Sequence, residues 1–153
     1  MKYIILDNIR SAYNVGAIFR TADGAGCDSV FLCGYTPTPI DRFGRRQTEI
    51  EKTSLGASSS LPWETHVSAV DLIKQLQAKG VTVVACEQSP NSISLTEFTE
   101  PAQVAYVVGN EVDGVQPEVL DIVDILVEIP MLGHKESLNV SVSAGIILYN
   151  GIT

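Results

Sequence analysis

Short apolar segments rich in β-branched residues alternate along the chain with stretches whose apolar residues recur at helical spacing. We expect strands at residues 2–6, 29–33, 81–86, 104–108 and 125–129. We expect helices at residues 15–25, 67–78, 117–123 and 138–149, whereas residues 48–60 fit a short helix followed by a flexible polar stretch. Strands that alternate with helices favour an α/β domain with a mostly parallel sheet covered by helices on both faces.

Length and composition are those of a single globular domain. The 153 residues, 45% apolar and 18% charged, suffice to bury an ordinary core, and we assign residues 1–153 to one domain. The apolar run near the start, YIIL, is too short for a membrane span or a secretory signal, so we expect a cytoplasmic protein without a membrane partner. Three cysteines without CxxC spacing and only two histidines predict reduced thiols and no metal site.

Charge is distributed unevenly along the sequence. The net charge of −8 argues against a general polyanion binder. Residues 1–46 nevertheless hold six Lys/Arg and four Asp/Glu, a balance of +2, while residues 47–153 hold four and fourteen, a balance of −10. We therefore expect the N-terminal third to meet any anionic ligand. Its arginines are Arg10, Arg20, Arg42, Arg45 and Arg46.

Polar and glycine-rich segments follow four of the predicted strands: DNIRSAYN, CEQS, GNEVDG and PMLGHKESLN. Ligands of open parallel sheets bind beyond the carboxyl ends of the strands, so we expect these loops to form one site. The last loop, within Ile129–Gly145, runs into a helix start, whose free N–H groups suit an anionic or polar ligand. Cys86 ends a strand and could be a nucleophile, but a buried thiol is the favoured interpretation.

Several of these residues have both a structural and a functional interpretation. Asn14 suits the N-cap of a helix, and Arg20 is either a surface arginine or a clamp for a phosphate or carboxylate. Glu111 is either a solvated loop acid or a hydrogen-bond partner for an arginine or a sugar hydroxyl. Ser137 or Asn139 suits the cap of the last helix. Neither a Walker loop, a GxGxxG fingerprint nor a GxSxG elbow is present, so common nucleotide-binding and hydrolase motifs are missing.

Three segments together resemble the motifs of the SpoU (TrmH) family of RNA ribose 2′-O-methyltransferases, in the SPOUT class. They are NVGAIFRTA at residues 14–22, GNEVDG at residues 109–114 and IPMLGHKESLNVSVSAG at residues 129–145. Their order and spacing cover nearly the whole chain; Ser143 departs from the family, whose members often have alanine there. The resemblance implies an α/β fold with a C-terminal deep trefoil knot, a homodimer, and S-adenosylmethionine held mainly by backbone groups of the knot loops.

The same resemblance implies roles for individual residues. Cofactor contacts carry over to Gly109, Ile129, Met131 and Leu138, with Cys86 and Glu87 as further candidates. The catalytic and structural polar set carries over to Asn14, Arg20, Glu111, Ser137 and Asn139.

The implied reaction is attack of a ribose 2′-hydroxyl on the sulfonium methyl of the cofactor. Because an arginine side chain stays protonated at neutral pH, we expect Arg20 to fix the RNA phosphate and polarise the hydroxyl. Asn14 and Glu111 would orient Arg20. Ser137 and Asn139 would shape the cofactor loop.

The expected substrate is tRNA or rRNA, and the expected RNA contacts are Arg10, Arg20, Arg42, Arg45 and Arg46. The chain begins almost directly at its first strand, so we expect no N-terminal RNA-binding extension. Because the chain is acidic overall, we expect few phosphate contacts unless an accessory RNA-binding partner supplies a basic surface. The alternative is a non-catalytic RNA-binding or assembly protein that keeps the knotted fold. The intact Asn14, Arg20 and Ser137–Asn139 favour the enzyme.

Overall fold

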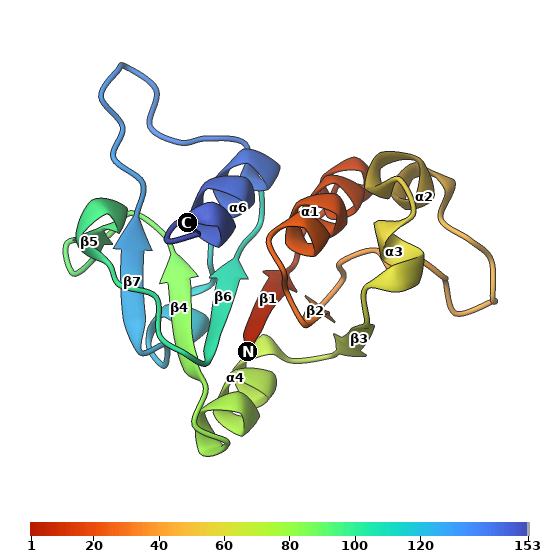
Figure 1. Cartoon of the computed structure of the whole chain (residues 1–153), viewed down its shortest axis with the longest axis horizontal. Coiled ribbons are helices and arrows are strands. Elements are labelled where there is room, and N and C mark those ends of the chain that lie inside the picture. Colours follow the sequence, from red (N-terminus) through yellow and green to blue (C-terminus); the bar gives the residue numbers. More distant parts are fainter. Residues whose placement is uncertain (153) are drawn as a thin grey trace.

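The computed structural model describes residues 1–152, and within them the chain forms one parallel sheet. The seven strands lie in the order β3-β2-β1-β6-β4-β7-β5 (Figure 1). Their bounds are β1 Lys2–Asp7, β2 Ser29–Cys33, β3 Trp63–His66, β4 Thr82–Cys86, β5 Ile93–Ser94, β6 Val104–Val108 and β7 Ile125–Glu128. Every pairing is parallel, which confirms the expected type of sheet.

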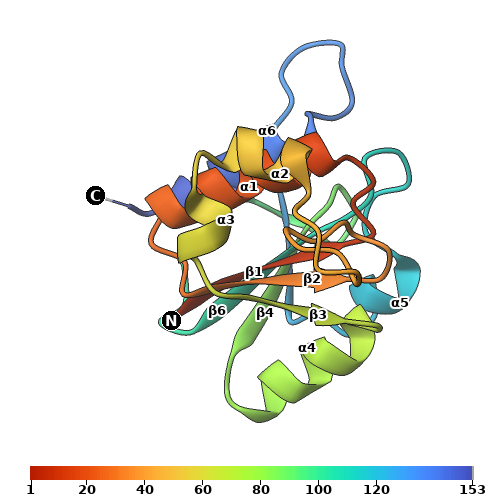
Figure 2. The same cartoon turned by 90° about the vertical axis from the view of Figure 1, so that its right-hand side faces the viewer.

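Helices cover both faces of this sheet, as expected (Figure 2). One face carries α1 (Ala12–Gly24), α2 (Thr48–Ser54), α3 (Ala57–Ser60) and α6 (Val140–Tyr149); the other carries α4 (Ala69–Ala78) and α5 (Pro117–Leu120). A short 3₁₀ helix, η1, spans Leu95–Glu97. No helix of residues 1–152 is long and apolar enough to cross a membrane.

Successive side chains of β1 lie in two separate hydrophobic cores, one on each face of the sheet. Ile4 and Leu6 pack with α1 and α6, whereas Ile5 packs with α4 on the opposite face. All three side chains are fully buried. A strand buried on both sides needs apolar residues at every position, so the run YIIL reads as continuously hydrophobic rather than alternating.

The structure differs from the sequence-based expectations at several element ends. Helix α1 begins at Ala12, because the Ser11 hydroxyl accepts a hydrogen bond from Asn14 N at 3.1 Å and serves as the N-cap. The expectation that Asn14 is the cap is therefore wrong. Residues 48–60 form two short helices, α2 and α3, rather than one helix and a flexible stretch.

Gly16 allows helices α1 and α2 to approach closely. A Cβ at this position would overlap Thr53 Oγ1 and lie 2.7 Å from the carbonyl oxygen of Ile50. Thr53 Oγ1 in turn donates to the Tyr13 carbonyl at 3.2 Å. The neighbour that approaches Gly16 is thus a helix of the same chain.

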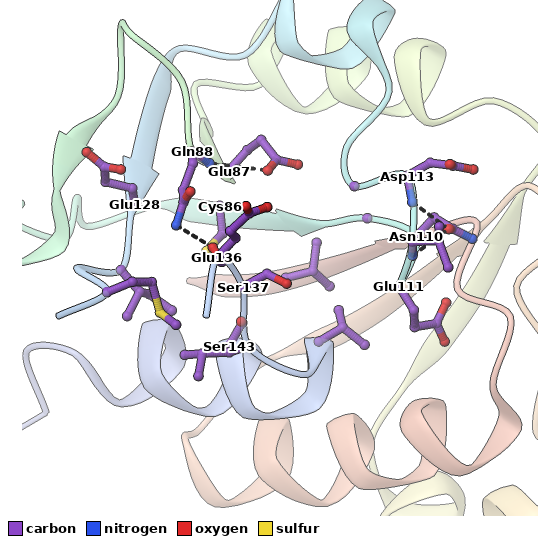
Figure 3. Close-up of a pocket in the computed structure, with 18 residues that line it drawn as sticks. Cys86, Glu87, Gln88, Asn110, Glu111, Asp113, Glu128, Glu136, Ser137 and Ser143 are labelled. Carbon is purple, nitrogen blue, oxygen red and sulfur yellow. Dashed lines mark hydrogen bonds between the residues drawn. The ribbon is translucent and has the colours of Figure 1, made fainter. Parts of the chain in front are cut away.

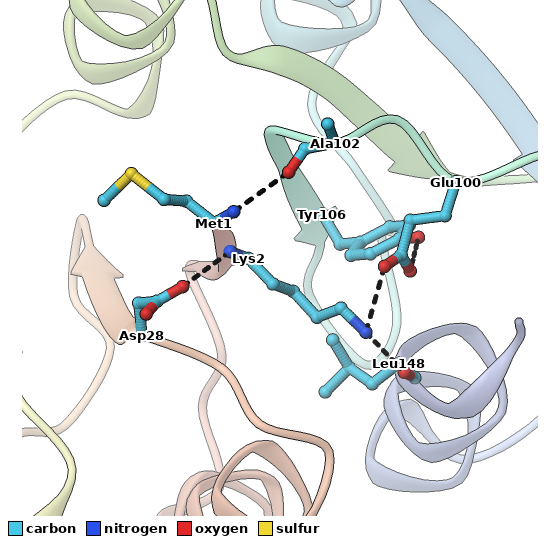
Figure 4. A network of polar contacts seen from close by, with 7 residues as sticks. All are labelled: Met1, Lys2, Asp28, Glu100, Ala102, Tyr106 and Leu148. Atoms are coloured by element: carbon cyan, nitrogen blue, oxygen red, sulfur yellow. Dashed lines mark hydrogen bonds and ion pairs between the residues drawn. The ribbon is translucent and has the colours of Figure 1, made fainter. Parts of the chain in front are cut away.

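A polar network ties the C-terminal end of α6 to the sheet (Figure 4). Lys2 Nζ donates to the Leu148 carbonyl and pairs with Glu100 Oε1, both at 3.1 Å, while its side chain is only 12% exposed. The Tyr106 hydroxyl donates to Glu100 Oε2 at 2.6 Å. A cation at the last carbonyls of a helix complements its dipole, so Lys2 both anchors and caps α6.

Candidate functional site

A pocket lies beyond the carboxyl ends of β4, β6 and β7, next to the start of α6 (Figure 3). Three of the four polar loops expected at this edge line it, and its wall consists of residues 86–88, 108–114, 128–129, 131, 136–138, 140 and 143. The fourth loop, after β1, reaches the pocket through hydrogen bonds to Glu111. Three of the four loops thus line the pocket as expected, while the loop after β1 lies next to it without lining it.

Glu87 and Gln88 connect the loop after β4 to its neighbours. Glu87 Oε2 accepts a hydrogen bond from Val115 N at 2.9 Å, and a Cβ on Gly114 would overlap this carboxylate. Gly114 also has φ +72°, a conformation that favours glycine. Gln88 Nε2 donates to the Glu136 carbonyl at 2.8 Å (Figure 3). These two side chains therefore fix the spacing between the three loops that line the pocket.

Asn110 organises the turn at residues 109–114. Its Oδ1 accepts from Val112 N at 2.8 Å and Asp113 N at 2.9 Å, while its Nδ2 donates to the Asn8 carbonyl at 2.9 Å and the Tyr35 hydroxyl at 2.8 Å. One amide thus satisfies four partners at a buried position. Asn110 was not among the sequence-predicted site residues, although Glu111 was; the sequence signal for it is an asparagine that opens a turn closed by a glycine.

Glu111 joins this turn to the start of α1. Its Oε1 accepts from Arg10 N at 2.9 Å, and its Oε2 accepts from Ser11 N at 2.9 Å and Asn14 Nδ2 at 3.1 Å. Burial alone would raise the pKa of Glu111, but these N–H donors outweigh it and lower the pKa. The sequence-predicted pair Asn14 and Glu111 is thus brought together, with the carboxylate ionised at a helix N-terminus.

Ser137 and Asn139 have different positions and contacts at the start of α6. Asn139 is the N-cap: its Oδ1 accepts from Ser141 N at 2.9 Å and from Ser141 Oγ at 2.6 Å. Ser137 lines the pocket, and so does Ser143 from the first turn of the helix (Figure 3). Ser143, noted in the sequence only as a departure from the family pattern, therefore adds a hydroxyl to the pocket wall.

Cys86 lines the pocket, and its thiol is a poor nucleophile. Burial, with a smaller contribution from the neighbouring Glu87, raises the pKa of its thiol to about 11. The thiol therefore stays protonated at neutral pH. Cys27 and Cys33 are buried, and all three cysteines are free, as expected.

Arg20 lies outside the pocket. It is exposed on α1 and lines a second, shallow hollow together with Tyr13, Lys52 and Tyr149. Among residues 1–152, Asn14 hydrogen-bonds Glu111 rather than the Arg20 side chain. The expected orientation of Arg20 by Asn14 and Glu111 is therefore not seen within one chain.

The remaining arginines lie on the surface of the N-terminal third. Arg10 precedes α1, and Arg42, Arg45 and Arg46 lie in the loop between β2 and α2. Arg45 pairs with Asp41 at 3.0 Å and Arg46 with Glu51 at 3.1 Å. Figure 1 shows this loop at the opposite end of the molecule from the loop that links β7 to α6. Arg42, Arg45 and Arg46 therefore do not form one patch with the pocket, whereas Arg10 lies beside it, since its backbone N–H donates to Glu111.

Residues 1–149 match the model of the SpoU rRNA Methylase family. The chain belongs to this family. It is 34% identical to the 23S rRNA (guanosine-2′-O-)-methyltransferase RlmB of Neisseria meningitidis, over 95% of this chain and 55% of that protein. The chain thus spans about half the length of the curated relatives that it matches.

Solved structures of SpoU proteins have the same fold. The AdoMet-bound rRNA methyltransferase from Sinorhizobium meliloti superimposes with a TM-score of 0.87 at 30% identity, over 97% of this chain and 54% of that one. The A. aeolicus TrmH/SpoU tRNA modifying enzyme gives a TM-score of 0.85 at 30% identity, over 97% and 72%. In this SpoU chain, the second and third motif segments line the pocket, and the first begins at Asn14 beside Glu111.

Proposed function

We propose that this chain is an S-adenosylmethionine-dependent RNA methyltransferase that methylates a ribose 2′-hydroxyl of tRNA or rRNA. One observation carries the proposal: all six residues that the resemblance implies as cofactor contacts line a single pocket. They are Cys86, Glu87, Gly109, Ile129, Met131 and Leu138. The AdoMet-bound relative from S. meliloti supports the cofactor, and the N. meningitidis relative supports the 2′-O position.

The side chains of the pocket suit this cofactor. Ile129, Met131 and Leu138 provide an apolar wall, and acidic residues, among them Glu87 and Glu136, lie around it. S-adenosylmethionine would supply a methyl group on a positively charged sulfonium, and an acidic surround favours a cationic ligand. The pocket therefore offers both an apolar contact and a matching charge.

The polar residues around the pocket take separate roles in the proposal. Asn14 and Glu111 hold the start of α1 against the turn at residues 109–114. Ser137 faces the pocket, and Asn139 fixes the loop before it by capping α6. Arg20 would bind the RNA phosphate and orient the 2′-hydroxyl; because a protonated guanidinium is not a base, the hydroxyl proton would pass to that phosphate or to water as the oxygen takes the methyl group from the sulfonium.

A homodimer would bring Arg20 of a second copy to the pocket. The exposed face of helix α6 is apolar: its Val142, Ile146 and Tyr149 are 49%, 39% and 48% exposed. An apolar helix face is normally buried, so we propose that a second copy of the chain packs against α6. Tyr149 also lines the hollow that contains Arg20, which supports an Arg20 position near such an interface.

Two inactive variants test whether each active site combines the pocket of one copy with Arg20 of the other. Arg20→Ala should keep cofactor affinity in calorimetry and lose methyl transfer, whereas Leu138→Arg should lose cofactor binding. When the two variants are mixed and allowed to exchange subunits, activity should return to about a quarter of the wild-type rate. Half of the dimers then contain one subunit of each variant, and each such dimer has one intact site out of two. Full activity of Arg20→Ala would refute the catalytic role. Inactive mixtures with proven exchange would place Arg20 in its own chain's site.

RNA contacts would centre on the five surface arginines Arg10, Arg20, Arg42, Arg45 and Arg46. With a net charge of −8, the chain would make few phosphate contacts, and the proposal includes an accessory RNA-binding partner with a basic surface. Charge reversal at Arg45 and Arg46 should weaken RNA binding, while reversal at the exposed Lys74 should not. Unchanged binding of the double variant would remove this loop from the proposal.

The proposal also includes a cytoplasmic location and the C-terminal knot. Strand β6 lies between β1 and β4, and the chain then passes to the far side of β4 as β7. It returns as α6, which packs with α1 in the same core. This path supports a threaded C-terminus, an arrangement that is rare outside a few families.

A further inference from the structure

A tight loop tip at residues 40–46 projects between β2 and α2. Ile40 and Arg46 form an antiparallel bridge, and Asp41 N donates to the Arg45 carbonyl at 2.8 Å. Asp41 Oδ1 accepts from Phe43 N and Arg45 N, both at 2.9 Å, and its Oδ2 accepts from Arg45 Nε at 3.0 Å. One carboxylate therefore braces the whole tip from inside the turn.

The tip presents an aromatic ring between cations. Phe43 is 66% exposed, and the guanidinium carbons of Arg42 and Arg45 lie 4.8 and 5.0 Å from its ring centroid. Arg45 is tied to Asp41, whereas Arg42 forms no ion pair among residues 1–152. The Arg42 guanidinium can therefore move from the ring to another anion without breaking an existing pair.

We propose that Phe43 is a stacking platform for an unpaired RNA base, with Arg42 and Arg45 on the neighbouring phosphates. Every base has a π face, and proteins that bind single-stranded RNA combine aromatic stacking with nearby arginines. The three arginines and one aspartate of the tip sum to +2 in a chain of net charge −8. Charge and aromatic exposure thus favour a polyanion with accessible bases. The inference rests on the proposed function.

The position of the tip assigns it to substrate binding rather than to chemistry. In Figure 1 the tip lies at the end of the molecule opposite the loop that links β7 to α6. A base on Phe43 would therefore lie far from the pocket of the same chain. Asp41 is a positioning residue: it touches no RNA and acts by holding Phe43 and Arg45.

Fluorescence anisotropy with a labelled oligoribonucleotide, single-stranded or paired in a duplex of the same sequence, tests the platform in the full chain. Base stacking on an aromatic side chain contributes enough that Phe43→Leu should weaken binding of the unpaired strand about 5- to 100-fold. Duplex binding should change less than about twofold, because its bases are already stacked. Phe43→Trp should retain or tighten binding of the unpaired strand.

Asp41→Asn separates positioning from simple charge. This change raises the net charge by one, so electrostatic attraction alone would tighten RNA binding. The platform predicts the opposite, weaker binding of the unpaired strand, because the tip loses its brace. Asp71→Asn, the same charge change on exposed Asp71 of α4, should leave binding unchanged or slightly tighter. Tighter binding by Asp41→Asn would overturn the positioning role and the ordered tip.

Methyl-transfer kinetics distinguish the inference from the proposed function. Phe43→Leu should raise the KM for RNA and leave kcat unchanged. The platform would be overturned, and the methyltransferase would stand, if the wild-type protein is active and Phe43→Leu binds RNA as tightly as wild type does. The same holds if Phe43→Leu loses equal affinity for unpaired and paired RNA. Wild-type protein that binds neither the methyl donor nor RNA would overturn the proposed function, and the platform with it.

Discussion

Glu111→Gln tests whether one carboxylate holds the pocket turn against helix α1. The three donors on Glu111 lie at 2.9, 2.9 and 3.1 Å, and glutamine can keep only one acceptor oxygen for them. Hydrogen bonds to a charged group contribute about 1.5–3 kcal/mol each when shielded, but this residue is exposed. We therefore expect a total loss of about 1–2 kcal/mol, or roughly 2–8 °C in Tm for a chain of this size.

The pH dependence of this loss identifies the carboxylate as its source. The folded pKa of Glu111 lies below its usual value of 4.5. The stabilisation is therefore fully present above the unfolded pKa and disappears as the pH falls through the folded pKa. The stability difference between wild type and Glu111→Gln, measured by urea unfolding at fixed protein concentration, should be largest near neutral pH and shrink on acidification.

A double-mutant cycle with Asn14→Ala isolates one of the three bonds. The coupling energy between Asn14 and Glu111 should be about 0.5–1.5 kcal/mol, because their side chains are in direct contact. Glu49→Gln, the same chemical change in the exposed first turn of α2, should alter stability by less than about 0.5 kcal/mol. Equal stability of wild type and Glu111→Gln at neutral pH, or a difference that is constant with pH, would refute the reasoning.

Three further changes probe the fold by thermal or urea unfolding. Gly16→Ala should destabilise by about 1–3 kcal/mol through overlap with α2, whereas Gly145→Ala meets only ordinary contact at 3.7 Å and should be neutral or slightly stabilising. Lys2→Met should cost about 1–3 kcal/mol by leaving Glu100 without its cation, while Lys74→Met on exposed α4 should change little. Burial, and to a smaller extent the nearby Glu118 carboxylate, raises the pKa of Asp7 in the folded protein. Asp7 therefore destabilises the folded protein increasingly as the pH rises from 3.8, the pKa of the unfolded chain, through the folded pKa. Asp7→Asn should flatten that decline; an unchanged pH profile would contradict it.

The central strands were predictable because burial on both faces leaves a continuous apolar run. Residues 29–33 and 104–108 form strands with the expected bounds. The edge strands β3 and β5 were missed, since they have four and two residues and few buried side chains. The start of α1 was missed because Ser11 and Asn14 are both good caps, and only the chain geometry selects between them.

The pocket residues were predictable to the extent that a motif names them. The role of Gln88 could not be predicted, because it donates to a backbone carbonyl of another loop, and spacing along the chain does not encode that contact. Asn110 had a local signal, the turn that it opens, but its bonds to Asn8 and Tyr35 join it to other loops. Arg20 shows the opposite limit. Its motif marks it as functional, yet within residues 1–152 it lines a different hollow from the pocket, and no sequence pattern gives the position of the proposed second copy.

The two ends of the molecule divide the electrostatic tasks of the proposed reaction. The pocket includes Glu87, Glu128 and Glu136, whereas the loop tip carries Arg42 and Arg45. An acidic pocket attracts a cationic donor and repels unpaired phosphates, so in the proposal the phosphate next to the reacting ribose would stay at the rim of the pocket, paired with Arg20 of the second copy, while the uncharged hydroxyl enters. The acidic residues around the pocket would therefore favour delivery of the sugar, rather than the phosphate, to the methyl donor.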